Sequence, residues 1–127
     1  MRRLGCEKEA IEQLLKAVDD FRTGLQERPN SPELHEGLGS ALLVLAEFDA
    51  AAKAFERAAE LNPDDLANYL NLAKALELQG LHDQAVSILQ RAIDYMQHKG
   101  RSKDAAQLRR YLEILAPEKS TSSQKDK

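Results

Sequence analysis

Residues 32–65 read PELHEGLGSALLVLAEFDAAAKAFERAAELNPDD, and this stretch decides the fold. Its small and large apolar residues recur at the spacings of two helices that pack face to face. The following residues, 66–99, repeat the pattern at a shift of 34 positions. A fixed period of this length predicts a stack of helical hairpins. The aligned pairs are Leu38 with Leu72, Gly39 with Ala73, Leu42 with Leu76, Ala51 with Ala85, Phe55 with Leu89, and Ala58 with Ala92.

Small residues recur where the two helices of a hairpin would touch. Gly39 and Ala73 stand in the first helix of each unit, and Ala51 and Ala85 stand in the second. Side chains of this size let two helices approach closely, while larger apolar residues fill the space around the contact. Pro63 separates the units, because its ring cannot continue a helix but suits the start of the next one.

This arrangement resembles the tetratricopeptide repeat (TPR) family. The motif of that family places a large residue, Leu, Gly or Ala and another large residue in helix A, and Ala, an aromatic residue, Ala and Pro in helix B. An unrelated bundle of helical hairpins is the alternative, which two consecutive in-phase matches disfavour. Residues 32–65 supply Leu38, Gly39, Ala51, Phe55, Ala58 and Pro63, and residues 66–99 supply Tyr69, Leu72, Ala73, Ala85, Leu89 and Ala92 without the closing proline.

We therefore expect an all-α, TPR-like α-α superhelix of antiparallel helix hairpins with a C-terminal capping helix. Upstream, Ala17, Phe21, Gly24 and Pro29 align with the helix B pattern, so the chain begins with a partial repeat that lacks its helix A or keeps a stub of it. A single domain is expected over residues 1–116, with the partial repeat at 7–31, full repeats at 32–65 and 66–99, a capping helix at 102–115, and a disordered tail at 117–127.

Caps and breakers set the expected helix bounds. Ser31 can cap a helix that begins at Pro32, and the acidic pair Asp64 and Asp65 suits the start of the next repeat. Gly80 is expected to end its helix in the left-handed conformation, and Ser102 is expected to cap the last helix. The expected helices span residues 7–28, 32–45, 49–61, 66–79, 82–98 and 103–115.

The composition fits one small globular domain. The chain has 127 residues, of which 43% are hydrophobic, 31% charged and only 5% aromatic, so packing relies on Ala and Leu. The net charge of −3 is unevenly spread: it is 0 over residues 1–31, −6 over 32–65, 0 over 66–99 and +3 over 100–127. A nucleic-acid binder would carry a basic working face, whereas the best-formed repeat here is acidic. We therefore expect no nucleic acid as partner.

Targeting and redox features are few. The single cysteine, Cys6, has no partner for an internal disulfide or a structural zinc site. The start MRRLGCEKEA lacks the apolar core of a secretory signal, and the sequence has no apolar run long enough to span a membrane. A cytoplasmic location is the default expectation. The sequence leaves open whether the chain is a fragment of a longer protein.

The sequence offers no catalytic motif. His35 and Glu36 begin like a zinc-protease motif, but Gly39 stands where the second histidine is needed. Gly37, Leu38 and Gly39 begin like a dinucleotide loop, but Leu42 replaces the third glycine and no strand precedes it. We therefore expect no enzyme activity, no cofactor and no metal site.

What remains for function is surface. The resemblance implies that the A helices line a concave groove that binds a peptide or helix of a partner protein. Four groove residues are apolar beyond the needs of the core, although packing against the N-terminal or last helix is the alternative explanation. The groove residues expected from the motif are Glu33, Glu36, Ser40, Leu43, Val44, Leu70, Asn71, Lys74, Glu77 and Leu78.

The partner's chemistry follows from the charges. Some members of the family clamp a terminal carboxylate with a set of Lys, Asn and Arg residues, of which only Asn71 is matched here. Glu36 and Ser40 replace two others, and Glu36 would repel a carboxylate. We expect a basic or amphipathic segment instead. The alternative function is self-association or structural docking in a larger assembly through the N-terminal end, with a homo-oligomer as one possible product.

Overall fold

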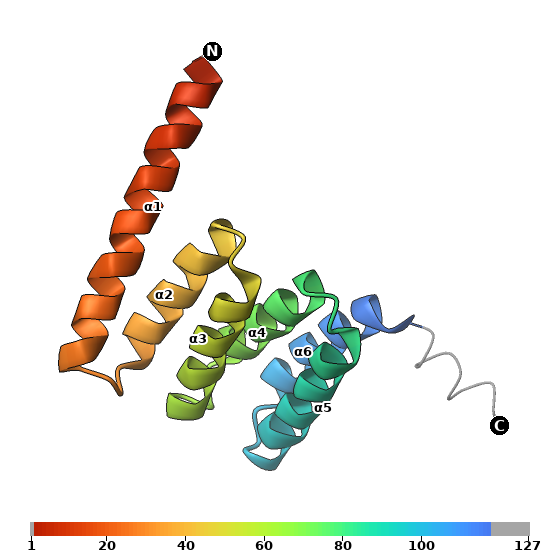
Figure 1. The fold of residues 1–127 in the computed structure, drawn as a ribbon. Coiled ribbons are helices and arrows are strands. Elements are labelled where there is room, and N and C mark those ends of the chain that lie inside the picture. Colours follow the sequence, from red (N-terminus) through yellow and green to blue (C-terminus); the bar gives the residue numbers. More distant parts are fainter. Residues whose placement is uncertain (1, 118–127) are drawn as a thin grey trace.

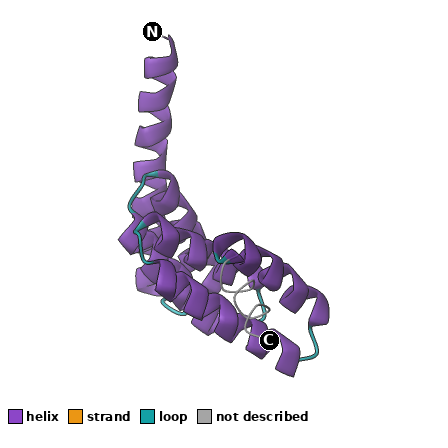
Figure 2. Cartoon of the chain, turned by 90° about the vertical axis from the view of Figure 1, so that its right-hand side faces the viewer, coloured by secondary structure: helices purple, strands orange, loops and turns teal. Residues whose placement is uncertain are grey.

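The computed structural model describes residues 2–117, and the side chains from Cys6 onward. Within that part of the chain every regular element is a helix, so the prediction of an all-α fold is confirmed (Figures 1 and 2). Each helix packs against the next along the chain, and α4 also contacts α6. The helices are α1 (Arg2–Glu27), α2 (Pro32–Val44), α3 (Phe48–Leu61), α4 (Leu66–Leu78), α5 (His82–His98) and α6 (Ser102–Leu115).

The helices form two layers. In Figure 1, α3 and α5 lie nearer the viewer, and α4 and α6 lie behind them. We call α2, α4 and α6 the A helices, since each opens a hairpin or caps the stack, and α3 and α5 the B helices. Among the A helices, α4 contacts α6, and Asp65 and Asn68 at the start of α4 lie close enough to Glu36 in α2 to affect its pKa.

The first helix differs most from expectation. The expected bounds were 7–28, but α1 already begins at Arg2 and runs unbroken to Glu27. Its residue equivalent to Phe48, the first residue of α3, is Leu14. Residues 2–13 therefore continue straight where a full repeat would turn back into helix A. No proline or left-handed residue interrupts them, so the helix persists and stands clear of the stack (Figure 2).

One of the two expected serine caps is present, and an aspartate caps the helix of the next repeat. The Ser31 hydroxyl accepts a hydrogen bond from the Leu34 N–H at 3.3 Å, with Pro32 as the first helical residue. An Asp65 carboxylate oxygen accepts one from the Ala67 N–H at 3.0 Å. The expectation for Ser102 is wrong: Ser102 is already helical, and Arg101 precedes it without a side-chain cap.

A residue in the left-handed conformation closes each of three turns, which join α2 to α3, α4 to α5 and α5 to α6. Ala46, Gly80 and Gly100 have φ angles of 64°, 82° and 75°. In each turn the N–H two residues beyond the helix cap bonds back to a carbonyl of the last turn, as in Glu47 to Leu42 at 2.9 Å. Gly80 behaves as predicted. Ala46, its equivalent one repeat earlier, takes the same conformation at the cost that a Cβ imposes there.

Replacing Ala46 with glycine is expected to stabilise the fold. Glycine adopts a positive φ without the steric cost of about 1–2 kcal/mol that an L-residue pays, and its greater freedom in the unfolded chain offsets part of the gain. A net gain of about 0.5–1 kcal/mol in urea unfolding is expected for Ala46→Gly. The reverse change at the equivalent position, Gly80→Ala, should destabilise. Equal stability of the parent chain and both variants would contradict a left-handed backbone at residues 46 and 80.

The core is built on ring-to-backbone contacts. The Phe55 ring lies so close to Gly39 that a Cβ there would come within 2.9 Å of it. Ala51 and Ala58, one turn to either side of Phe55, are fully buried. The next hairpin uses Ala73, Ala85 and Leu89 in the same way, and all three are fully buried. The spacing of 34 positions thus predicts the core contacts as well as the helices.

Changes at this contact should be costly. Ala51→Leu overpacks a site that has no free space and should destabilise by about 1–3 kcal/mol. Phe55→Ala removes a buried ring and leaves a cavity, with an expected cost of about 3–5 kcal/mol. Lys53→Ala, on the exposed side of the same helix, is the control. Denaturant melts in which the two core variants match that control would refute the assigned core.

The last helix covers the end of the stack. Ala105 and Leu108 are fully buried against α5, while Arg109, Arg110 and Glu113 are exposed. Tyr111 is half-buried and widens the buried stripe, whereas Ile114 is exposed. The expected tail at 117–127 falls, apart from Pro117, outside the described residues.

Candidate functional site

Three exposed apolar side chains stand at equivalent places on the A helices. Val44, Leu78 and Ile114 are 70%, 50% and 74% exposed and lie at the C-terminal ends of α2, α4 and α6. Val44 and Leu78 are separated by one repeat of 34, and Ile114 follows 36 positions later. Because the A helices are neighbours in one layer, these side chains form a row, which we call the apolar row.

Only part of the predicted apolar groove is free. Val44 and Leu78 belong to the apolar row. Leu43 and Leu70, by contrast, are half-buried and pack against the core. These two leucines therefore contribute to the core and are less available to a partner.

The predicted polar residues divide in the same manner. Glu33, Ser40 and Lys74 are exposed on the A layer, and Asn71 is half-buried. Glu77 is engaged within the chain, because its carboxylate lies 2.6 Å from the His82 ring at the start of α5. Glu77 thus ties the turn between α4 and α5 and is less available to a partner.

Glu36 carries an electrostatic strain. Burial raises the pKa of its carboxyl, and the negative charges of Asp65 and Glu33 raise that pKa further. The Asn68 amide opposes the rise, although its geometry falls short of a hydrogen bond to the carboxylate. A cation placed beside Glu36 would relieve the repulsion.

Asn68 was missed by the sequence reasoning. It is 1% exposed, and neither atom of its amide has a hydrogen-bond partner among the described residues. Its equivalent one repeat earlier is Leu34, which packs on Gly24. A polar residue at a position that is apolar in the other repeat was the signal, because such residues are retained against a cost in stability.

Replacing Glu36 with glutamine should stabilise the protein at neutral pH. Because folding raises the pKa of Glu36 above its ordinary value of 4.5, ionisation of this carboxyl lowers the stability of the fold at pH 7. The loss disappears once the pH falls below the pKa that Glu36 has in the unfolded chain. Glu36→Gln should therefore melt higher than the parent at pH 7, with a gain that fades toward pH 4. Glu113→Gln, on the exposed side of α6, is the control. A gain that persists at low pH would show that the charge is not its cause.

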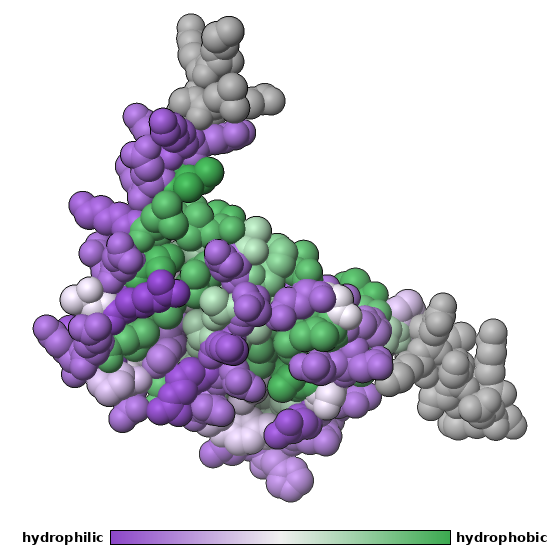
Figure 3. Space-filling model, viewed as in Figure 1, coloured by the Kyte–Doolittle hydropathy of each residue, from purple (hydrophilic) through white to green (hydrophobic). Residues whose placement is uncertain are grey.

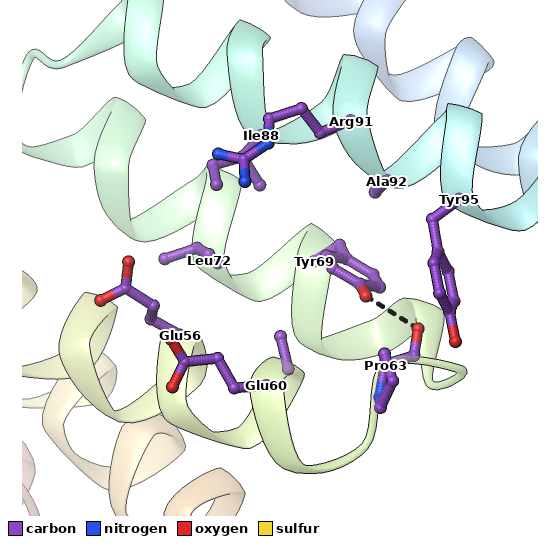
Figure 4. Close-up of a pocket in the computed structure, with 10 residues that line it drawn as sticks. Glu56, Glu60, Pro63, Tyr69, Leu72, Ile88, Arg91, Ala92 and Tyr95 are labelled. Carbon is purple, nitrogen blue, oxygen red and sulfur yellow. Dashed lines mark hydrogen bonds between the residues drawn. The ribbon is translucent and has the colours of Figure 1, made fainter.

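A cleft lies between α3, α4 and α5 (Figure 4). Its volume is about 400 Å³, with Leu72 and Ala92 in its wall. The hydroxyls at its end are already used, since Tyr69 donates to the Pro63 carbonyl and Tyr95 to Asp64, each at 2.8 Å. These bonds fix the turn between α3 and α4. The cleft is therefore explained by the packing of one repeat on the next.

The described residues hold no cluster suited to metal chemistry. No group of three His, Cys, Asp or Glu side chains comes together in the part of the chain that the structure describes. Cys6 is exposed and has no disulfide partner. None of the described helices combines the length and the apolar character that a membrane span requires.

Comparison with known proteins identifies the repeats. Residues 37–96 match the family model described as tetratricopeptide repeat. These residues belong to the TPR family. The match covers both helices of the first full repeat beyond Gly37 and nearly all of the second, so the family prediction is confirmed on the residues that carried it. TPR units generally mediate protein–protein interactions and serve as non-catalytic scaffolds.

The similar sequences are much longer proteins. Tetratricopeptide repeat protein 37 of Xenopus laevis is 31% identical over 78 residues, which are 61% of this chain and 5% of that protein. Superkiller complex protein 3 of Homo sapiens is 29% identical over 85 residues, which are 64% of this chain and 5% of that protein. The chain thus spans a small fraction of the length of the curated relatives it matches.

Solved structures support the TPR-like superhelix. A crystal structure of MamA protein aligns with a TM-score of 0.58 and 21% identity, over 93% of this chain and 79% of that one. A second MamA structure gives the same score and identity over 94% of this chain and 86% of the other. At this identity the likeness concerns the fold alone.

Proposed function

We propose that this chain is a non-catalytic interaction module that binds a segment of a partner protein across its A helices. The observation that carries the proposal is the apolar row. Large exposed apolar side chains are usually scattered on a surface, whereas here one stands at the C-terminal end of each of the three A helices. Nothing in the packing of the fold requires Val44, Leu78 or Ile114 to be large and apolar.

The spacing of the row suggests how a partner would lie. Neighbouring packed helices are about 8–10 Å apart, so the row extends over about 20 Å. A segment in the polyproline II conformation rises about 3.1 Å per residue with three residues per turn, so every third side chain lies on the same face and reaches the next member of the row. The proposed partner is therefore an extended segment of about seven residues with apolar anchors at its first, fourth and seventh positions.

The charges give the segment a direction. Glu33 and Glu36 lie on the same helix as Val44, about three and two turns before it. Lys74 in α4 is exposed, and Arg110, its equivalent in α6 at the shift of 36, is exposed as well. A segment with basic residues near the α2 end and acidic residues near the α6 end would complement both. This refines the expectation of a basic or amphipathic partner, and the charges should govern orientation and association rate more than residence time.

The test uses synthetic peptides with three apolar anchors and opposite charges at their ends. Fluorescence polarisation should show tighter binding of the peptide with the basic end toward α2 than of the same composition reversed. Leu78→Ala should weaken binding about tenfold or more at any salt concentration, because burying a leucine contributes about 1.5–3 kcal/mol. Glu33→Lys with Glu36→Lys should weaken it mainly at low salt, because exposed charges are screened over about 8 Å at physiological ionic strength.

The matched control is Ile11→Ala, which removes an exposed apolar side chain outside the row. Its affinity should equal that of the parent chain. The A layer would be ruled out as the binding surface if alanine variants of Val44, Leu78 and Ile114 all bound the peptide like the parent chain.

A further inference from the structure

The N-terminal half of α1 is free of the other helices. α1 and α2 run antiparallel, with Phe21 against Gly37 and Gly24 against Leu34. Continued along the two helices, this register brings the end of α2 level with Leu14. Beyond that level the helix stands alone (Figures 1 and 2).

This free segment begins with an apolar face. Ile11 and Leu15, one turn apart, are 49% and 53% exposed, and Leu14 beside them is half-buried. Figure 3 shows the apolar surface running along α1 on the side that faces the viewer. Ile11 lies beyond the level at which α2 ends, and Leu15 is turned away from the side that carries Phe21 and Gly24, so both side chains remain exposed.

The repeat pattern also places Leu15 outside the stack. Leu15 is equivalent to Asp49, which is exposed in α3. Gly24 packs on Leu34 of α2 and lies on the opposite side of α1 from Leu15. The side of α1 that carries Leu15 is therefore open to a partner outside the repeat stack.

Charges beside this face specify the partner. Lys8 and Asp19 are exposed and flank Ile11 and Leu15 on one side of the helix. They are 11 positions apart, which is close to three full turns. The pair Ile11 and Leu15 is centred on residue 13, and the pair Lys8 and Asp19 is centred between residues 13 and 14. Both pairs therefore share one centre along α1.

We propose that the α1 helices of two copies of this chain pair in antiparallel orientation about this centre. Ile11 of each copy then packs on Leu15 of the other, and Lys8 of each copy meets Asp19 of the other, so every contact occurs twice as a two-fold axis requires. A parallel pairing would instead oppose Lys8 to Lys8 and Asp19 to Asp19. Because α2 ends level with Leu14, the body of the second copy lies beyond the end of the first.

The first test is the mass of the full chain in solution, measured by sedimentation equilibrium from micromolar to submillimolar concentration. The parent chain should approach the mass of two chains, whereas Ile11→Glu and Leu15→Glu should keep the mass of one. Both positions are exposed and helical, so circular dichroism should stay unchanged. Val44→Glu, on the apolar row, is the control and should dimerise like the parent. This control separates the dimer from the proposed groove function, since it should lose peptide binding only.

The second test fixes the register. Lys8→Asp and Asp19→Lys should each weaken the dimer at least several-fold at low salt, and the double variant should restore it, because both pairs are then reversed together. A parent chain that stays monomeric at every concentration, or that forms open-ended oligomers, would overturn the proposal. So would a double variant that is no better than the single ones.

Discussion

The close approach of the Phe55 ring to Gly39 is the contact on which the rest of the stack depends. The ring can lie on the backbone of α2 only because no Cβ stands there. Ala51 and Ala58 are fully buried, and their small side chains let α3 pack closely against its neighbours. A larger side chain at any of these places would tilt one helix, and each later helix takes its position from the one before it.

The same regular stacking explains the candidate site. Since each hairpin repeats the geometry of the last, a feature at the end of one A helix recurs at the end of the next. Val44, Leu78 and Ile114 are brought into line by this repetition rather than by contacts with one another. The buried, unpaired amide of Asn68 and the raised pKa of Glu36 lie on the same layer. Both residues lie nearer the N-terminal ends of their helices, at least two turns before the apolar row.

The two ends of the stack are finished differently. α6 buries Ala105 and Leu108 and turns charged residues outward, as a repeat array needs at its end. α1 packs on α2 over only part of its length, and Gly37 makes room for Phe21 there. Its remaining turns keep an apolar face in water. The asymmetry gives the molecule two separate surfaces, one on the A layer and one on α1.

The sequence by itself determined the repeat, the helix order, most helix bounds and the small residues at the helix contacts, because these follow from spacing and from local cap and turn chemistry. It could not place Ile114 or Glu77, since exposure of the first depends on how α6 docks and the second is engaged by His82. It predicted a helix over residues 7–28, but the structure begins this helix at Arg2. Only tertiary packing decided these points, since each depends on which neighbour is present in space.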